Sequence, residues 1–137
     1  MKIHFTKKRE KQTSSEKTES HFTDSTTIAS CAVKASYDLN AKLIIVFTYS
    51  GQSAQTVAHY RPKCPILAVT PNEWAAKALL LHAGMHSMMV GSLIGRETLQ
   101  GKVILEARKR GLLNEKAVVG EFVVLTSGLA GDIGNTN

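Results

Sequence analysis

The sequence lacks the features that mark several protein classes. It has only two cysteines, Cys31 and Cys64, and no CxxC motif, so neither a disulfide framework nor a zinc site is predicted. No apolar run reaches the roughly 20 residues needed to span a bilayer, and no apolar signal-peptide segment follows the N-terminal lysines. We therefore expect a cytoplasmic protein without a membrane partner and with two buried, reduced thiols. One disulfide stays open at this point, because the distance between the thiols is unknown.

Paired carboxylates are also missing. The chain has 11 Asp and Glu against 17 Lys and Arg, and its acidic residues are scattered. No two are spaced as a metal site would need, and no P-loop or nucleophile-elbow motif occurs. We therefore predict no catalytic residues, no metal ligands and no cofactor in this chain. His59, His82 and His86 are expected to be surface or structural residues.

The positive charge is densest at the N-terminus. Residues 1–22 hold six basic and three acidic residues, which is +3 of the total net charge of +6. These residues are rich in Ser, Thr, Lys and Glu and follow neither hydrophobic period, so we expect a basic, disordered tail. Because the surplus is not concentrated on the part expected to fold, nucleic acid is a poor candidate for a partner. Salt-sensitive attraction of polyanions by the tail is a separate possibility.

Residues 23–137 read as one folded domain. Apolar residues at helical spacing, such as Ile28, Ala32 and Leu39, predict a helix over 23–40. Four short apolar runs follow, at 43–47, 66–69, 85–90 and 121–126, with helical patterns between them, which is typical of buried parallel strands. We therefore predict an α/β fold, a three-layer sandwich around a mostly parallel sheet of about four to five strands.

The third helical pattern starts with Thr70-Pro71-Asn72-Glu73, which has the form of a capping box with Thr70 as N-cap. The helix it starts is expected to bury Trp74, Ala78 and Leu81. Trp74 is thus predicted to be a core residue, with a subunit interface as the alternative.

The segment after the first predicted strand has the composition of an anion-binding turn. Ligands of open α/β sheets bind beyond the carboxyl ends of the strands, and free N–H groups at a helix N-terminus suit a phosphate. Gly51 would let the backbone approach the anion, and nearby hydroxyl groups could donate to it. An ordinary turn capped by Ser50 or Ser53 explains the same pattern. The candidate residues are Thr48, Tyr49, Ser50, Gly51, Gln52 and Ser53.

Several stretches resemble the C-terminal domain of pyruvate kinases: residues 28–34, 41–46, 48–53 and 58–69. Tyr60-Arg61-Pro62 followed by Pro65-Ile66 is the most distinctive of them, and the resemblance extends over about residues 23–137. It implies that residues 48–53 receive a phosphate of an allosteric effector, which is fructose 1,6-bisphosphate in many members. It also implies that Gly128, Gly131 and Gly134 lie in the effector loop.

The chain departs from the family pattern at three places. Gln52 stands where many relatives have arginine. A tryptophan and an arginine that hold the second phosphate in the animal enzymes correspond here to Ser92 or Leu93 and to Leu99, with Arg96 nearby. The family's last strand is expected to be missing.

The resemblance implies membership of a glycolytic kinase that transfers a phosphoryl group from phosphoenolpyruvate to ADP with magnesium and potassium. That reaction needs a (β/α)₈ barrel, and this chain has none of its motifs. We therefore expect an effector-binding and subunit-assembly domain that does not catalyse alone. Its partners would be a phosphorylated sugar or a similar anion, further copies of itself, or other pyruvate kinase subunits. Two alternatives remain: a stand-alone interaction protein that pairs with pyruvate kinase subunits, and a basic nucleic-acid-associated module.

Overall fold

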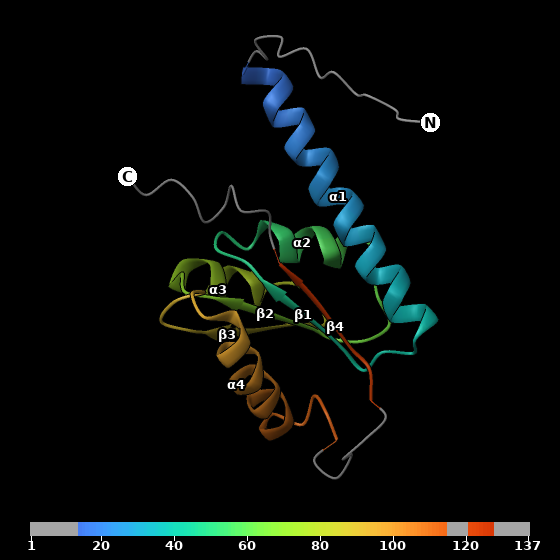
Figure 1. The fold of residues 1–137 in the computed structure, drawn as a ribbon, viewed down its shortest axis with the longest axis vertical. Helices are drawn as coiled ribbons and strands as arrows, with labels where there is room; N and C mark the ends of the chain where they lie inside the picture. The colour runs from blue at the N-terminus through green and yellow to red at the C-terminus, as the bar shows by residue number, and fades with distance from the viewer. Residues whose placement is uncertain (1–13, 115–120, 128–137) are drawn as a thin grey trace, which may run out of the picture.

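Helices and strands alternate along the chain, as the sequence predicts. Figure 1 shows the computed structural model, which describes residues 14–114 and 121–127. The elements are α1 (Ser14–Asp38), β1 (Leu43–Phe47), α2 (Gln52–His59), β2 (Ile66–Thr70), α3 (Glu73–Leu79), β3 (Met85–Met89), α4 (Arg96–Lys109) and β4 (Val123–Ser127). Each strand lies within or next to one of the four predicted apolar runs.

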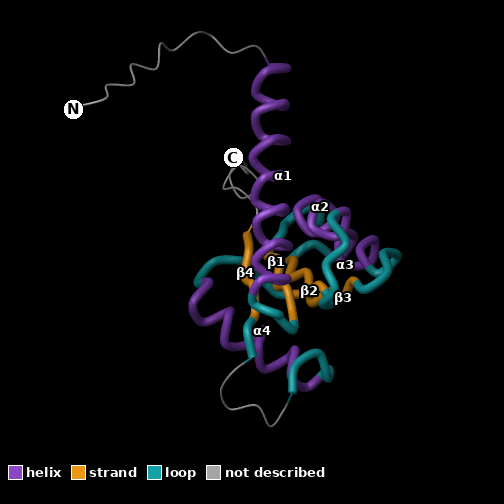
Figure 2. Tube along the Cα trace, turned by 90° about the vertical axis from the view of Figure 1, so that its right-hand side faces the viewer, coloured by secondary structure: helices purple, strands orange, loops and turns teal. Residues whose placement is uncertain are grey.

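The four strands form one parallel sheet in the order β3-β2-β1-β4. The central strands β1 and β2 are buried over their full length, so both of their faces need a cover. Residues of α1, α2 and α3 pack on one face, around Ile44, Val46 and Ala68. Residues of α4 pack on the other, around Leu43, Ile45 and Leu67. Figure 2 shows α4 across the sheet from α2 and α3, and the predicted three-layer α/β sandwich is confirmed.

The first helix begins earlier than predicted. It starts at Ser14, inside the segment expected to be a tail, and passes through the expected boundary at residue 23. Its inner face is made of small residues such as Ala29 and Ala32, while Ile28 and Leu39 from the predicted apolar face are exposed. Residues 1–13 lie outside the described part, so the division into a tail and a domain stays a prediction. No helix in the described ranges is long and apolar enough to cross a membrane.

The buried face of α3 differs from the prediction. Trp74 is 82% exposed and Leu81 is 88% exposed, whereas Leu79 is fully buried. The reason lies in the cap: the side chain of Asn72, not that of Thr70, accepts from the backbone N–H groups of Trp74 (3.0 Å) and Ala75 (3.4 Å). The helix therefore starts two residues later than a Thr70 cap would set, and a different set of positions faces the sheet. The prediction of Trp74 as a core residue is wrong.

Both thiols are free, but only one is partly buried. Cys31 is exposed on α1, in contrast to the prediction, and Cys64 is half-buried before β2. Burial raises the pKa of the Cys64 thiol, and a hydrogen bond with the Ser36 side chain acts in the opposite direction.

Candidate functional site

The predicted anion-binding turn lies at the carboxyl end of the sheet, between β1 and α2. Thr48 follows the last residue of β1, is buried, and donates its N–H to the carbonyl of Val69 at 3.0 Å, which ties the turn to the end of β2. Its Oγ1 accepts from the N–H of Gly51 at 3.0 Å. The Thr48 side chain therefore shapes the turn from the inside.

Gly51 has a conformation that other residues avoid. It precedes the first helical residue of α2 and has φ 88° and ψ −9°, in the left-handed region. A Cβ at this position would lie 3.4 Å from the Leu79 side chain of α3. The turn thus faces the Leu79 side chain of α3.

A second buried hydroxyl fixes the other side of the turn. Thr70, the last residue of β2, donates its Oγ1 hydrogen to the carbonyl of Tyr49 at 3.0 Å. The same oxygen accepts from the N–H of Asn72 at 3.1 Å. Thr70 was predicted to cap α3, but it joins the turn to the chain that enters α3.

The outer part of the turn is open to solvent. Tyr49, Ser50 and Gln52 are exposed, and Ser53 is half-buried. No side chain caps α2, and the N–H of Gln52 approaches Ser50 Oγ only at 3.4 Å. The N–H groups of Ser53 and Ala54 have no acceptor within the described ranges, which is the arrangement that an anion at a helix N-terminus needs.

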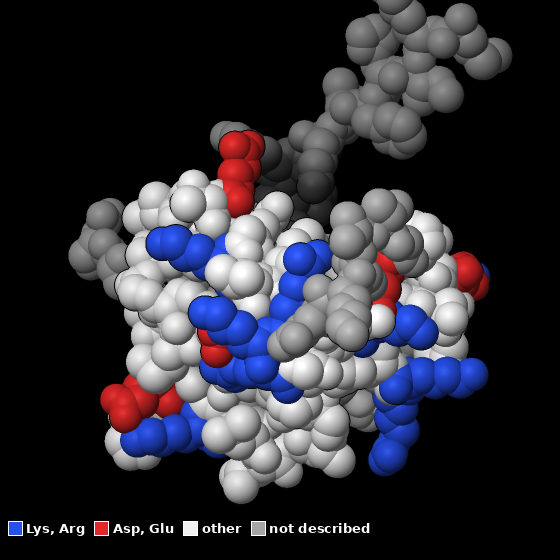
Figure 3. Space-filling view, turned by 90° about the horizontal axis from the view of Figure 1, so that it is seen from below, with Lys and Arg blue, Asp and Glu red and all other residues white. Residues whose placement is uncertain are grey.

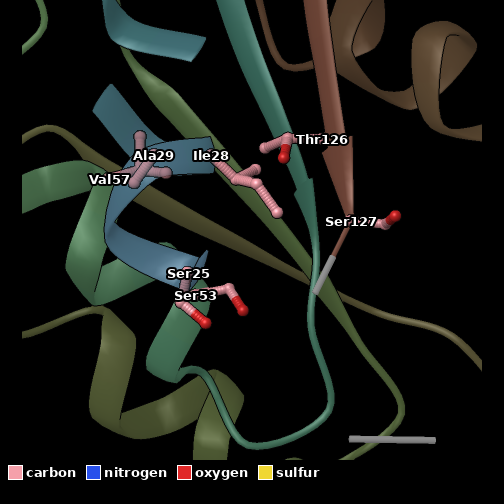
Figure 4. A pocket seen from close by; sticks show the side chains of 7 residues that line it. All are labelled: Ser25, Ile28, Ala29, Ser53, Val57, Thr126 and Ser127. Atoms are coloured by element: carbon pink, nitrogen blue, oxygen red, sulfur yellow. The ribbon is translucent and has the colours of Figure 1, made fainter. Parts of the chain in front are cut away.

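A small hollow lies next to Ser53. Figure 4 shows its lining: Ser25, Ile28 and Ala29 from α1, Ser53 and Val57 from α2, and Thr126 and Ser127 from β4. Its volume of about 10 Å³ is room for about one water molecule, and a phosphate does not fit inside it. An anion at the turn would therefore lie outside the hollow, over the N-terminus of α2, where Ser53 is half-buried and Ala54 is buried.

The end of β4 brings a further predicted segment to the turn. Phe47 of β1 pairs with Ser127 of β4, so the chain leaves β4 beside the start of the turn. The predicted effector-loop residues Gly128, Gly131 and Gly134 follow directly, and they lie outside the described residues. Nothing in the structure tests their role.

The turn has no charged side chain of its own. Gln52 is neutral, and Leu99 of α4, predicted from the sequence to match the family's arginine, is buried in the core. Ser92 accepts from the N–H of Ile94, and the Arg96 side chain lies outside the described part. No cluster of three or more His, Cys, Asp or Glu able to hold a metal occurs among the described residues. The chemistry available at the turn is that of hydrogen-bond donors.

Comparison with known proteins decides the family. A family model described as "Pyruvate kinase, alpha/beta domain" matches residues 26–137. The chain belongs to this family. A pyruvate kinase of Dictyostelium discoideum is 39% identical over 112 residues, covering 81% of this chain and 21% of that protein. One of Agaricus bisporus is 34% identical over 116 residues, covering 81% and 22%.

Solved structures of the family have the same fold. The pyruvate kinase of Cryptosporidium parvum in complex with ADP superposes with a TM-score of 0.71 at 27% identity, over 81% of this chain and 21% of that one. The chain thus spans about a fifth of the length of these relatives. The predicted resemblance to the pyruvate kinase C-terminal α/β domain is confirmed. The whole enzymes, to which the kinase activity belongs, are about five times as long as this chain.

Proposed function

We propose that this pyruvate kinase α/β domain binds a phosphorylated effector at residues 48–53 and passes the effect to the subunits with which it assembles. The observation that carries the proposal is the uncapped N-terminus of α2, held open by the hydrogen bond between Thr48 and Gly51. The N–H groups of Ser53 and Ala54 and the exposed Ser50 hydroxyl belong to this N-terminus. A phosphorylated sugar or a similar anion matches these donors.

The donor set predicts modest affinity. A helix N-terminus contributes about 0.3–1 kcal/mol to a bound anion, up to ~2 kcal/mol in partly buried geometry. Each hydrogen bond to a charged group adds about 1.5–3 kcal/mol. Without a cation at Gln52, the site lacks one such bond, which corresponds to a roughly ten- to hundredfold weaker complex than that of a relative with arginine there.

Transmission requires that the effector prefer one packing arrangement of the domain. The Leu79 side chain faces Gly51 and offers the route, because a shift of the turn backbone toward the core would bring it against α3. In the complete enzyme, catalysis with magnesium and potassium would then take place outside this chain.

The test is isothermal titration calorimetry of the 137-residue chain with fructose 1,6-bisphosphate. Ser50→Asp places a carboxylate beside the free amides and should weaken binding at least tenfold. Ser30→Asp, at an exposed position of α1, is the matched control and should leave the affinity unchanged. Equal affinity of the wild type and Ser50→Asp would remove the turn as the site.

A second candidate function is pairing with pyruvate kinase subunits as an interaction protein. Within the described residues β4 is an edge strand that pairs only with β1, and its neighbour Phe122 and its own Leu125 are exposed. Edge strands with exposed apolar residues favour association. Size-exclusion chromatography with and without intact pyruvate kinase tests this candidate, which predicts co-elution in the absence of effector; separate elution would exclude it.

A further inference from the structure

The end of the sheet opposite the turn carries an excess of positive charge. Residues that precede the strands or end the helices there include seven cations and three carboxylates: Lys34, Lys42, Arg61, Lys63, Arg108, Lys109 and Arg110, with Asp38, Glu106 and Glu121. Figure 3 shows Lys and Arg side chains gathered near the middle of the underside of the molecule. A folded face is therefore basic, which the charge count along the sequence did not indicate. Such a face raises the local concentration of anions.

A cavity opens at this end of the sheet. It has a volume of about 530 Å³, within the range of small-molecule sites. Its walls come from the second half of α2, the segment before β2 and the link between α3 and β3. The polar side chains in the lining are those of Gln55, His59, Arg61, Cys64 and His82, and no carboxylate is among them. The lining therefore offers donors to an anion and no negatively charged side chain.

Arg61 is held in an uncommon backbone conformation within this lining. Its φ is 50°, in the left-handed region that a residue with a Cβ adopts at a cost. Two hydrogen bonds keep it there: Tyr37 Oη donates to its carbonyl at 2.9 Å, and its own N–H donates to the carbonyl of Ala58 at 3.0 Å. Backbone strain of this kind is concentrated at functional sites. The guanidinium pairs with no carboxylate in the part of the chain that the structure describes.

Two features of the cavity oppose an anion, and both are reduced. The helices α2 and α3 end here, and helix C-termini carry partial negative charge. Part of this charge is already used, since the carbonyls of Val57, Ala58 and Leu79 accept from the N–H groups of Tyr60, Arg61 and His82. Burial raises the pKa of the Cys64 thiol, which therefore stays neutral near pH 7.

We propose that this cavity is an anion site, separate from the turn, that takes the phosphate group of a small metabolite. The Arg61 guanidinium is the principal donor, in the two-pronged geometry suited to phosphate oxygens, and His59 and His82 donate from the sides. The cavity volume suits a ligand of metabolite size and excludes a folded partner.

The experiment is titration of the 137-residue chain with pyrophosphate, followed by calorimetry and by the imidazole proton resonances of His59 and His82. Arg61→Gly removes the guanidinium and suits a φ of 50°, so loss of binding in this variant does not come from unfolding. We expect the affinity to fall roughly ten- to a hundredfold. Arg61→Lys should retain part of it, because the charge stays but the two-pronged geometry is lost.

Lys109→Gln is the matched control, because Lys109 is a cation of the same basic face but does not line the cavity. Its affinity for pyrophosphate should change less than threefold. Equal losses in Arg61→Gly and Lys109→Gln would overturn the site and leave only diffuse attraction. Unchanged histidine resonances, or binding of citrate in preference to pyrophosphate, would also overturn the proposal. Ser50→Asp should leave pyrophosphate binding at this cavity unchanged. The proposal of a cavity site can therefore fail while the proposal of effector binding at the turn holds, and the reverse.

Discussion

Replacing glycines by alanine tests whether the turn depends on the left-handed conformation of Gly51. A residue with a Cβ pays about 1–2 kcal/mol in that region. The added Cβ would meet Leu79 at 3.4 Å, an ordinary contact distance, so steric conflict adds little to this cost. Gly51→Ala should therefore lower the free energy of unfolding by about 1–2 kcal/mol.

Two other glycines separate the backbone term from the contact. Gly84 has φ 73° with nothing within 4 Å of an added Cβ, so Gly84→Ala should show the backbone cost alone. Gly101 lies inside α4, without a positive φ and with open space around it, so Gly101→Ala should stabilise the domain by about 0.5–1 kcal/mol. We therefore expect the free energy of unfolding to fall in Gly51→Ala and Gly84→Ala and to rise in Gly101→Ala.

The assay is urea unfolding followed by circular dichroism, with equal m-values as the check that only stability changes. A loss in Gly51→Ala that matches the loss in Gly84→Ala supports the conformational argument. A Gly51→Ala variant as stable as the wild type would refute it. The turn would then accept another backbone conformation, and the uncapped amides of α2 would not be held in place by Gly51.

Two further predictions concern side chains that the structure exposes or buries. Trp74→Ala should change stability by less than about 0.5 kcal/mol because the indole is largely exposed, whereas Leu79→Ala should cost about 2–5 kcal/mol, as measured by urea unfolding; a larger loss for Trp74→Ala would place Trp74 in an interface. Cys31 should react with a maleimide faster than Cys64 at neutral pH, because Cys31 is exposed and burial raises the pKa of Cys64. A thiol with a raised pKa in the folded state stabilises it below the ordinary value of 9.0, and this contribution is lost as the pH rises through the folded-state pKa. Unfolding at alkaline pH should therefore become easier in the wild type than in Cys64→Ala, and equal pH profiles would contradict the assignment.

The sheet could be predicted from sequence because its central strands are buried on both faces. Runs such as residues 43–47 consist of apolar residues alone, and no other element of this length fits them. The buried faces of the helices were harder to predict. The α3 face was predicted wrongly because Thr70 and Asn72 are both good caps, and the hydroxyl of Thr70 is occupied by Tyr49, 21 residues away in the chain.

The candidate turn was predicted by position but not by mechanism. Its place after a buried strand follows from residue types alone. The internal role of Thr48 depends on its burial, which the sequence does not reveal. Arg61 belongs to the most distinctive stretch of the family resemblance, but its left-handed backbone could not be predicted, because it depends on a hydrogen bond from Tyr37 on α1. Such positions are set by tertiary contacts, and local propensity cannot report them.

The position of Leu79 next to Gly51 also gives the domain an optical reporter. Trp74 is the single tryptophan of the chain and lies on the same short helix as Leu79, with the Lys77 ammonium 5.8 Å from the centre of its ring. A change in the turn that moved Leu79 would change the surroundings of the indole. The intrinsic fluorescence of the unlabelled chain can therefore follow occupancy of the turn in real time.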